Sequence, residues 1–312
     1  MRAMPISVLI PTYKRSADLA RCLHAITRQS RPPDQVIVVC RQDDRETKVL
    51  LESPDRWPFA LQIVSVQVPG QVAALNAGLA RVDSEIVAIT DDDAAPRPEW
   101  LSRIERHFAS DSKIGGVGGR DYVHVGNRES EKSQVGILQW FGRRIGNHHR
   151  GTGMARAVDF LKGANMSYRM AAVGRLRFDE RLRGSGAQVH NDFAFSLGVR
   201  RRGWRLIYDP AVAVDHYPAE RFGEDQRTER SQRAVNASAY NETIAILEHL
   251  PKYRHGFFWL WAIAAGTEEL PGLLRCLLPT KGASQRRARL RPMLSGRLAA
   301  ASRAYRKNRD QL

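Results

Sequence analysis

Three adjacent acids, Asp91, Asp92 and Asp93, directly follow the apolar segment EIVAIT (85–90). Adjacent carboxylates repel one another, so the arrangement is costly unless a cation lies among them. On an extended segment Asp91 and Asp93 would point to the same side of the chain. A divalent cation held by one or two carboxylates and by substrate phosphates fits this pattern, which predicts an Mg²⁺ or Mn²⁺ site. The alternative is an acidic loop ahead of a helix that begins near Pro98.

A second candidate is the turn Pro11-Thr12-Tyr13-Lys14-Arg15, which closes the first apolar segment of the chain. Pro11 ends a strand, because proline cannot donate a hydrogen bond to a sheet. The turn can then present backbone N–H groups and an aromatic face to a nucleotide base. The alternative is an ordinary connection between a strand and a helix.

Two further positions fit either a chemical or a structural role. Asp192, in the segment His190-Asn191-Asp192, lies at the head of a predicted helix, where a carboxylate is a helix cap or a general base. His216 closes the apolar segment AVAVDH and is a metal ligand or a structural histidine.

The elements that must position these residues alternate along residues 1–110. Short apolar segments rich in Val and Ile predict strands, and the helical spacing of apolar residues predicts a helix over Ser16–Gln29, with Ser16 as its N-cap. The predicted strands are 7–10, 35–39, 61–66 and 85–90, and two more helices are predicted over 70–80 and 98–109. This alternation predicts an α/β fold with a mostly parallel central sheet flanked by helices. Ligands bind such sheets beyond the carboxyl ends of the strands, where the candidate residues lie.

Strands are predicted again in the middle of the chain, over 115–125 and 160–169. A helix follows near 192–202, and then a strand pair over 205–210 and 211–216. We therefore expect a catalytic domain over 1–218, divided near residue 110, and a helical region over 219–312.

The composition limits the class of protein. Apolar residues make up 43% of the 312, which supports a folded core, and the three cysteines lie far apart, which indicates a reducing, cytoplasmic compartment. The first apolar segment is too short for a signal peptide and is expected to be a buried strand. The net charge of +16 is concentrated in the tail, where residues 275–312 hold eleven Lys and Arg and one acid. A basic nucleic-acid-binding module is one alternative, but no known signature of that class is present, so no nucleic acid is expected.

The most apolar segment, GFFWLWAIAAG (256–266), is shorter than the roughly 20 residues of a membrane-spanning helix. It is either a core helix or a helix that lies in a membrane interface, where the basic tail would be attracted to anionic lipid. The second alternative predicts peripheral attachment to an anionic surface, the inner face of the cell membrane.

The ordered set of motifs over residues 5–218 resembles family 2 glycosyltransferases of the GT-A fold. The nucleotide-binding half of that family is similar to SVLIPTYKRSADLARCLHAI, QVIVV, VAALNAGLA and ITDDDAAPRPEWL, and its acceptor half to FLKGANMSYRMAAV, FDERLRGSG, NDFAFSLGVRRRGW and IYDPAVAVDHYP. The resemblance implies an inverting transferase that uses a nucleotide-diphospho-sugar and Mg²⁺ or Mn²⁺.

Individual roles follow from the same resemblance. Asp91-Asp92-Asp93 matches the DxD motif, whose first acid contacts the ribose and whose last binds the metal. Asp192 matches the catalytic base, and His216 matches a histidine near the metal and diphosphate. Pro11, Thr12 and Tyr13 match the turn that lines the nucleotide base, and Arg15 belongs to the same donor-binding turn.

Three departures from the family pattern bear on recognition. The acid that reads the base is commonly part of an Asp pair directly after the second strand, but here Cys40-Arg41-Gln42 occupies that place and the nearest acids are Asp43 and Asp44. Leu75 replaces the basic residue that often precedes the asparagine at Asn76. Asn191 replaces the first acid of the catalytic pair. The nucleotide base is therefore left open.

The expected function is transfer of a sugar from a nucleotide donor to a glycan or lipid-linked hydroxyl, in bacterial surface polysaccharide or glycolipid synthesis. A nucleotidyltransferase that forms a sugar nucleotide is the other enzymatic alternative. Such enzymes usually carry a Gly-rich basic loop after the first strand, which PTYKRSAD lacks.

Overall fold

The computed structural model describes residues 3–52, 57–124, 130–219, 231–279 and 282–309. By their contacts these form two compact units. The first comprises Met1–Ile137, Gly146–Phe178 and Phe195–Ala219, and the second Leu138–Ile145, Asp179–Ala194 and Glu220–Leu312. Two short segments ahead of residue 219 therefore group with the C-terminal helices. The division at residue 218, and at residue 110, stays a prediction.

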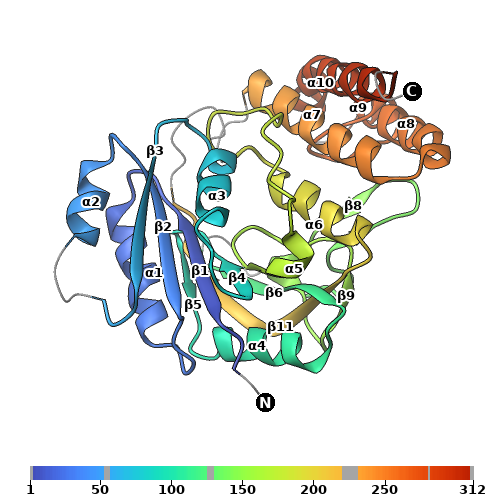
Figure 1. The fold of residues 1–312 in the computed structure, drawn as a ribbon. Coiled ribbons are helices and arrows are strands. Elements are labelled where there is room, and N and C mark those ends of the chain that lie inside the picture. Colours follow the sequence, from blue (N-terminus) through green and yellow to red (C-terminus); the bar gives the residue numbers. More distant parts are fainter. Residues whose placement is uncertain (1–2, 53–56, 125–129, 220–230, 280–281, 310–312) are drawn as a thin grey trace. The chain divides into compact units, whose positions relative to one another are not determined.

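The first unit is built on one large sheet, and Figure 1 shows its strands β1, β2 and β3 side by side. The strand order is β3-β2-β1-β4-β10-β6-β11-β5, and β9 pairs with β11. The strands are β1 (Ile6–Pro11), β2 (Gln35–Arg41), β3 (Leu61–Val66), β4 (Ile86–Ile89), β5 (Ala94–Pro96), β6 (Ile114–Val123), β9 (Arg156–Val158), β10 (Met166–Arg169) and β11 (Arg205–His216). The predicted first four strands are confirmed, as is the mostly parallel sheet flanked by helices.

Strand direction brings distant parts of the sequence to one edge of this sheet. β3, β2, β1 and β4 are parallel to their neighbours, whereas β10 runs antiparallel to both β4 and β6. β6 therefore runs in the same direction as β4, and β11 is parallel to β6. The carboxyl ends of β1, β2, β4, β6 and β11 consequently lie at the same edge, where ligands bind in sheets of this class.

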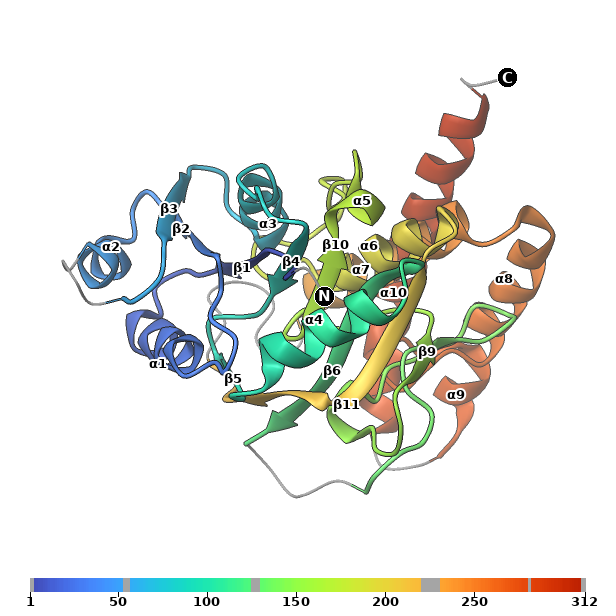
Figure 2. The ribbon, with the colours of Figure 1, turned by 60° about the horizontal axis from the view of Figure 1, so that its bottom comes forward.

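Helices cover both faces of the sheet because alternate strand residues point to opposite faces. Val8 and Ile10 belong to an apolar cluster with residues of α1 (Ser16–Thr27) and α4 (Trp100–Ser110). Leu9, on the other face, packs closely against Gly78 of α3 (Gln71–Leu79). Figure 2 shows α3 on one side of the sheet and α1 and α4 on the other. The unit also contains α2 (Arg45–Leu51) and α5 (Met170–Val173), and α6 (Asn191–Arg201) begins in the second unit and ends in the first.

Some local expectations are wrong. Ser16 is the first residue of α1, and the cap position is held by Arg15, which makes no capping side-chain bond. The expected strand pair is one strand, β11, whose register shifts between Asp209 and Val214. Strand structure within 160–169 is limited to β10, which starts at Met166.

The second unit is mainly helical. It contains α7 (Gln232–His249), α8 (His255–Ala264), α9 (Leu273–Leu277), α10 (Ala283–Arg309) and a short turn of 3-10 helix, η2 (Lys252–Arg254). A similar turn, η1 (His148–Arg150), belongs to the first unit. A small hairpin joins β7 (Ile137–Leu138) to β8 (Arg144–Ile145). α7 and α10 are joined by Arg297, which is fully buried and donates to Glu242 Oε2 at 3.0 Å and to Thr243 Oγ1 at 2.8 Å. A buried cation needs such partners, because an unpaired one would be strongly destabilising.

The apolar segment 256–266 forms α8 and is neither wholly buried nor wholly exposed. Phe258 and Ala262 are buried, whereas Phe257, Leu260 and Ile263 face solvent. Across the described ranges, no helix combines the length and the apolar character needed to cross a bilayer.

Gly119 in β6 generates a stability prediction. A Cβ atom there would lie 1.8 Å from the Val212 carbonyl oxygen and 2.4 Å from that of Asp209, and both are backbone atoms that cannot rotate away. We expect Gly119→Ala to lower the free energy of unfolding by about 3 kcal/mol or more, measured by urea denaturation. The control is Gly256→Ala on α8, where an added Cβ meets no atom within 4 Å; it should leave stability within about 1 kcal/mol of wild type. Equal stability of both variants would contradict this close approach of β6 and β11.

Candidate active site

The turn after β1 and the acids after β4 meet through Asp92. Thr12 Oγ1 donates to Asp92 Oδ2 at 2.8 Å, and Arg15 Nη1 donates to Asp92 Oδ1 at 2.9 Å. Asp92 and Thr12 are buried. The middle acid therefore joins two neighbouring strand ends, and it faces protein groups.

The three acids lie in a turn, since Ala94 N donates to the Asp91 carbonyl at 3.2 Å. The expected extended segment is therefore wrong, and each acid has different surroundings. Asp91 is half-buried and accepts a hydrogen bond from Gln71 Nε2 at 3.1 Å. Asp93 is buried and faces the end of β11, where its Oδ2 accepts from Ala219 N at 3.0 Å.

Asp93 and His216 lie together, as a shared metal site requires. His216 Nε2 is 3.2 Å from Asp93 Oδ1, and its Nδ1 is 3.4 Å from Asp121 Oδ2. Asp121 comes from the carboxyl end of β6 and is paired with Lys162. All three members of the Asp93–His216–Asp121 chain are buried, so the imidazole is held between two carboxylates that fix its ring orientation.

Burial and charge shift the pKa values of these groups in different directions. Burial raises the pKa of Asp92 to about 7, against the opposing effect of the Arg15 charge. Burial also acts to raise the pKa of Asp93 and of Asp121, but His216 outweighs it for Asp93, and Lys162 and His216 outweigh it for Asp121, so both pKa values lie below the usual range. The pKa of His216 is raised, because hydrogen bonds to Asp121 and Asp93 outweigh its burial.

A second group of residues follows β1 and β2. The guanidinium carbon of Arg41 lies over the Tyr13 ring, 4.9 Å from the ring centroid. The Tyr13 hydroxyl donates to Asp43 Oδ2 at 3.2 Å. Asp43 is exposed at this edge, whereas Asp44 is buried as the N-cap of α2 and accepts from Thr47 N and from Lys14 N. Of the two predicted acids, Asp43 is thus available to a ligand and Asp44 stabilises the turn.

Asn76 is engaged with backbone groups. Its Nδ2 donates to the Phe178 carbonyl at 2.9 Å, and its Oδ1 accepts from Phe178 N at 2.8 Å. This pair of bonds ties α3 to the segment that follows α5. Pro11 is the buried last residue of β1.

Asp192 belongs to the second unit and lies in the first turn of α6, half-buried, where its Oδ1 accepts from Phe193 N at 2.7 Å. Asn191 is buried and donates to the carbonyls of Ala187 and Gln188. His190 adopts a left-handed backbone with φ of 72°, and its Nε2 lies 3.0 Å from Ser238 Oγ on α7. Asn191 therefore holds the loop ahead of the helix, and a carboxylate in its place would lack the amide N–H donors.

Gln71, Asp121 and Lys162 are not among the residues that the sequence singles out. Asp121 and Lys162 lie in GGRDYV and FLKGAN, segments whose apolar character predicts strands. The sequence signal that points to Asp121 is a charged pair, Arg120-Asp121, near the end of an otherwise apolar strand. Its pairing with Lys162 depends on β10 lying between β4 and β6, which no local pattern predicts.

The donor set fits a divalent metal completed by substrate. Among the described residues, no three His, Cys, Asp or Glu side chains form a group that could hold a metal ion. Asp93 and His216 could supply two ligands, a carboxylate and an imidazole, a set that suits Mn²⁺ and, less well, Mg²⁺. Mg²⁺-type sites are commonly completed by substrate phosphates and water, so two protein ligands are sufficient.

Comparison with known proteins identifies relatives that match most of the chain. Residues 3–237 match the family model described as "Glycosyltransferase like family 2". The glycosyltransferase AglE of Haloferax volcanii is 31% identical over 101 residues, which are 31% of this chain and 33% of AglE. Chondroitin synthase of Escherichia coli is 25% identical over 277 residues, which are 80% of this chain and 38% of the synthase. This chain thus spans 33% of the length of AglE and 38% of the length of the synthase.

Solved structures with the same fold include a mannosyltransferase and the protein TarS. The mannosyltransferase PcManGT of Pyrobaculum calidifontis, in complex with GDP-Man and Mn²⁺, is 18% identical with a TM-score of 0.54, covering 98% of this chain and 88% of that one. TarS (residues 1–349) of S. aureus, in complex with UDP-GlcNAc, is 14% identical with a TM-score of 0.56, covering 98% and 92%. At these identities the likeness establishes the GT-A fold.

The bond from Thr12 to Asp92 generates a prediction about stability. Thr12→Val keeps the shape of the side chain but leaves a buried carboxylate oxygen without this donor, and we expect a loss of about 1–3 kcal/mol in the free energy of unfolding. Thr27→Val is the matched control, because the Thr27 hydroxyl donates to the His24 carbonyl in an exposed position. It should change stability by less than about 0.5 kcal/mol. Equal urea midpoints for the two variants would contradict a structural role for this bond.

Proposed function

The chain belongs to glycosyltransferase family 2, and we propose that it transfers a sugar from a nucleoside diphosphate donor to an acceptor hydroxyl, with inversion at the anomeric carbon. The observation that carries the proposal is the contact of Asp93 with His216 at the carboxyl edge of the sheet. The two side chains come from the ends of β4 and β11, and a donor diphosphate bound at that edge would meet both.

Asp93 and His216 would hold Mg²⁺ or Mn²⁺, which as a Lewis acid neutralises charge on the departing diphosphate. Asp121 and Lys162 keep the His216 ring in place from behind. Arg15 is half-buried, and its guanidinium donates to Asp92. Thr12 also donates to Asp92, so Asp92 anchors the turn after β1 to the acidic segment after β4. Thus Asp92 and Asp121 support the site, and Asp93 and His216 are the groups proposed to meet the donor diphosphate through the metal.

The nucleoside is assigned to the exposed residues of the same edge. Tyr13 offers an aromatic face beside Arg41, and Asp43 offers a carboxylate to the donors on a base. Asp91, half-buried beside Gln71, is placed to accept from a ribose hydroxyl. We leave the base open, because Asp43 follows Cys40-Arg41-Gln42 where family members commonly have an acid pair.

Asp192 is our candidate for the general base. Its carboxylate takes the proton of the acceptor hydroxyl as the oxygen attacks the anomeric carbon, and the bond from that carbon to the diphosphate breaks on the opposite side. A nucleoside diphosphate leaves, and the new glycosidic bond has inverted configuration. The left-handed His190 and the buried Asn191 support the turn that presents Asp192.

The acceptor is proposed to be a growing glycan or a lipid-linked sugar of a surface polysaccharide or glycolipid. The relative named chondroitin synthase supports this class of product. Cytoplasmic location, at the inner face of the membrane, is part of the same proposal.

The reaction class and the metal are tested together. We expect one member of a panel of UDP-, GDP- and dTDP-sugars to bind at least about tenfold more tightly with Mn²⁺ than with EDTA, by calorimetry, and to yield a free nucleoside diphosphate. Asp93→Asn should lose that metal dependence, because it removes a charged ligand. Asp83→Asn, at an exposed position outside the site, should keep it.

Release of pyrophosphate would identify a nucleotidyltransferase instead. Metal-dependent donor binding that survives Asp93→Asn would remove Asp93 from the metal site. Steeply salt-dependent binding of DNA or RNA, without binding of any donor, would support a nucleic-acid-binding protein.

The base is tested separately. Asp192→Asn keeps the size of the side chain but removes proton acceptance, so kcat should fall by about 10²-fold or more while the Kd of the donor stays within about twofold. The kcat is measured by nucleoside diphosphate release with saturating acceptor, and the Kd by calorimetry. An unchanged kcat would exclude Asp192 as the base.

A further inference from the structure

The second unit exposes a continuous row of large apolar side chains on α8 and α9. On α8, Phe257, Leu260 and Ile263 recur every three residues and so share one face of the helix, opposite the buried Phe258 and Ala262. The α9 segment adds Leu273, Leu274, Leu277 and Leu278, all exposed. Leu260 and Leu277 are 70% and 74% exposed. Soluble surfaces carry such side chains singly, and a contiguous patch indicates an interaction site.

The α8 and α9 side chains form one surface. Leu260 and Ile263 line a cavity of about 330 Å³ together with Leu273 and Leu274. At the other end of the row, the exposed Trp140 lies with its ring centroid 4.4 Å from that of Phe257. We call this surface the α8–α9 apolar face; it consists of Trp140, Phe257, Leu260, Ile263, Leu273, Leu274, Leu277 and Leu278.

Arginines border this face at both ends. Arg254 donates to the Trp140 carbonyl at 2.6 Å and lies 5.9 Å from the centroid of its ring. Arg275 is part of α9, and Arg287 of α10 donates to the Cys276 carbonyl at 3.3 Å. Residues 250–306 contain eleven Lys and Arg but only two acids, Glu268 and Glu269. An apolar strip edged by cations complements a surface whose interior is apolar and whose rim is anionic.

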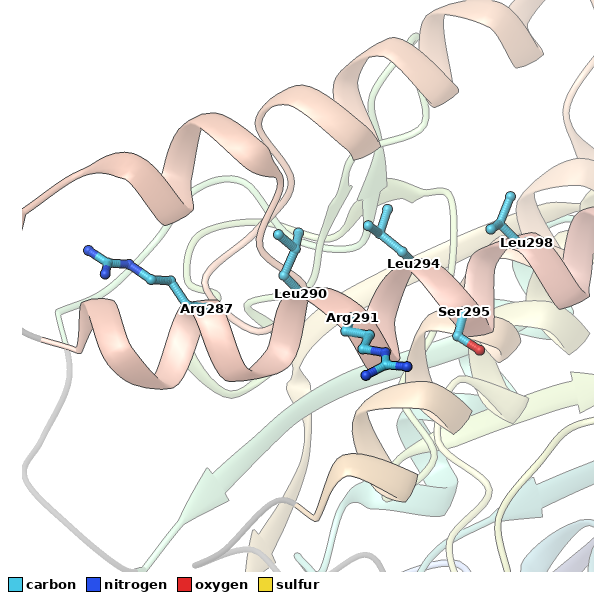
Figure 3. A pocket seen from close by; sticks show the side chains of 6 residues that line it. All are labelled: Arg287, Leu290, Arg291, Leu294, Ser295 and Leu298. Atoms are coloured by element: carbon cyan, nitrogen blue, oxygen red, sulfur yellow. The ribbon is translucent and has the colours of Figure 1, made fainter.

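Helix α10 repeats this arrangement beside the face. Arg287, Leu290, Arg291, Leu294, Ser295 and Leu298 line a cavity of about 490 Å³. Figure 3 shows the three leucines projecting from one side of the helix and Arg291 and Ser295 from another. Leu298, Arg287 and Arg291 are exposed. Thus α10 also combines a leucine row with flanking positive charge.

We propose that the α8–α9 apolar face docks on an anionic lipid membrane. α8 has 10 residues and so extends about 15 Å, half the thickness of a bilayer core, which fits a helix lying in the interface plane. Its apolar side chains enter the boundary between headgroups and acyl chains, with Trp140 at headgroup depth. Arg254, Arg287 and Arg291 contact the lipid phosphates. The inference adds a binding surface to the proposed transfer and does not depend on it.

The test is flotation of the full chain with vesicles of phosphatidylcholine, alone or mixed with phosphatidylglycerol, without donor or acceptor. We expect binding to the mixed vesicles only. Replacing Leu260 and Leu274 together by Ser should weaken it at least about tenfold, because both side chains are transferred from water. The matched control replaces Val49 and Met154 by Ser, two exposed apolar residues of the first unit, and should bind as wild type does. Replacing Arg287 and Arg291 by Gln should weaken binding about fivefold per charge and reduce its sensitivity to salt.

Circular dichroism and thermal unfolding confirm that each variant is folded before its binding is compared. Absence of wild-type binding to the mixed vesicles, or equal binding by the Leu260/Leu274 variant, would overturn the proposal. A second copy of the chain is the competing occupant. Light scattering that shows a dimer, lost in the Leu260/Leu274 variant without any vesicle binding by wild type, would assign the face to self-association.

Discussion

The first unit depends on one electrostatic constraint, which is the neutralisation of buried carboxylates at a single edge of the sheet. Asp92, Asp93 and Asp121 have almost no contact with water, and the basic groups that face them are Arg15, Lys162 and His216. Each acid and its partner come from different strand ends. The sheet order therefore has to be correct before any pair can form, and misplacing one strand would leave a buried charge unpaired.

The same constraint distinguishes the acids that support the site from the groups that are proposed to take part in the reaction. Asp92 is occupied by Thr12 and Arg15, and Asp121 by Lys162, so these two acids fix the positions of their neighbours. Asp93 and His216 remain directed at each other at the open end of β4 and β11. A family 2 glycosyltransferase needs such a division, because a precise site is held by groups that do not themselves meet the substrate.

Much of the fold could be predicted from local sequence. β1 to β4, α1, α3 and α4 follow apolar patterns with clear periods, and their boundaries differ from expectation by a few residues, whereas α2 is not predicted from the sequence. The bend in the Asp91–Asp93 segment could not be predicted from local sequence. The chain turns there so that the acids contact Arg15, Gln71 and His216, none of which is close in sequence. The sequence predicts a strand pair over 205–210 and 211–216, but β11 is one strand that continues through a register shift. The role of Lys162 could not be predicted from local sequence either, because its partner, Asp121, lies 41 residues away.

The central claim is that Asp93 and His216 together receive the metal of a donor complex. The most direct measurement is the anomalous difference map of a crystal grown with Mn²⁺ and the tightest-binding nucleotide-sugar. The account predicts one manganese peak within about 2.3 Å of both an Asp93 carboxylate oxygen and His216 Nε2, with the diphosphate completing its coordination. A bound donor whose manganese contacts neither side chain, with the two residues still paired to each other, would contradict it.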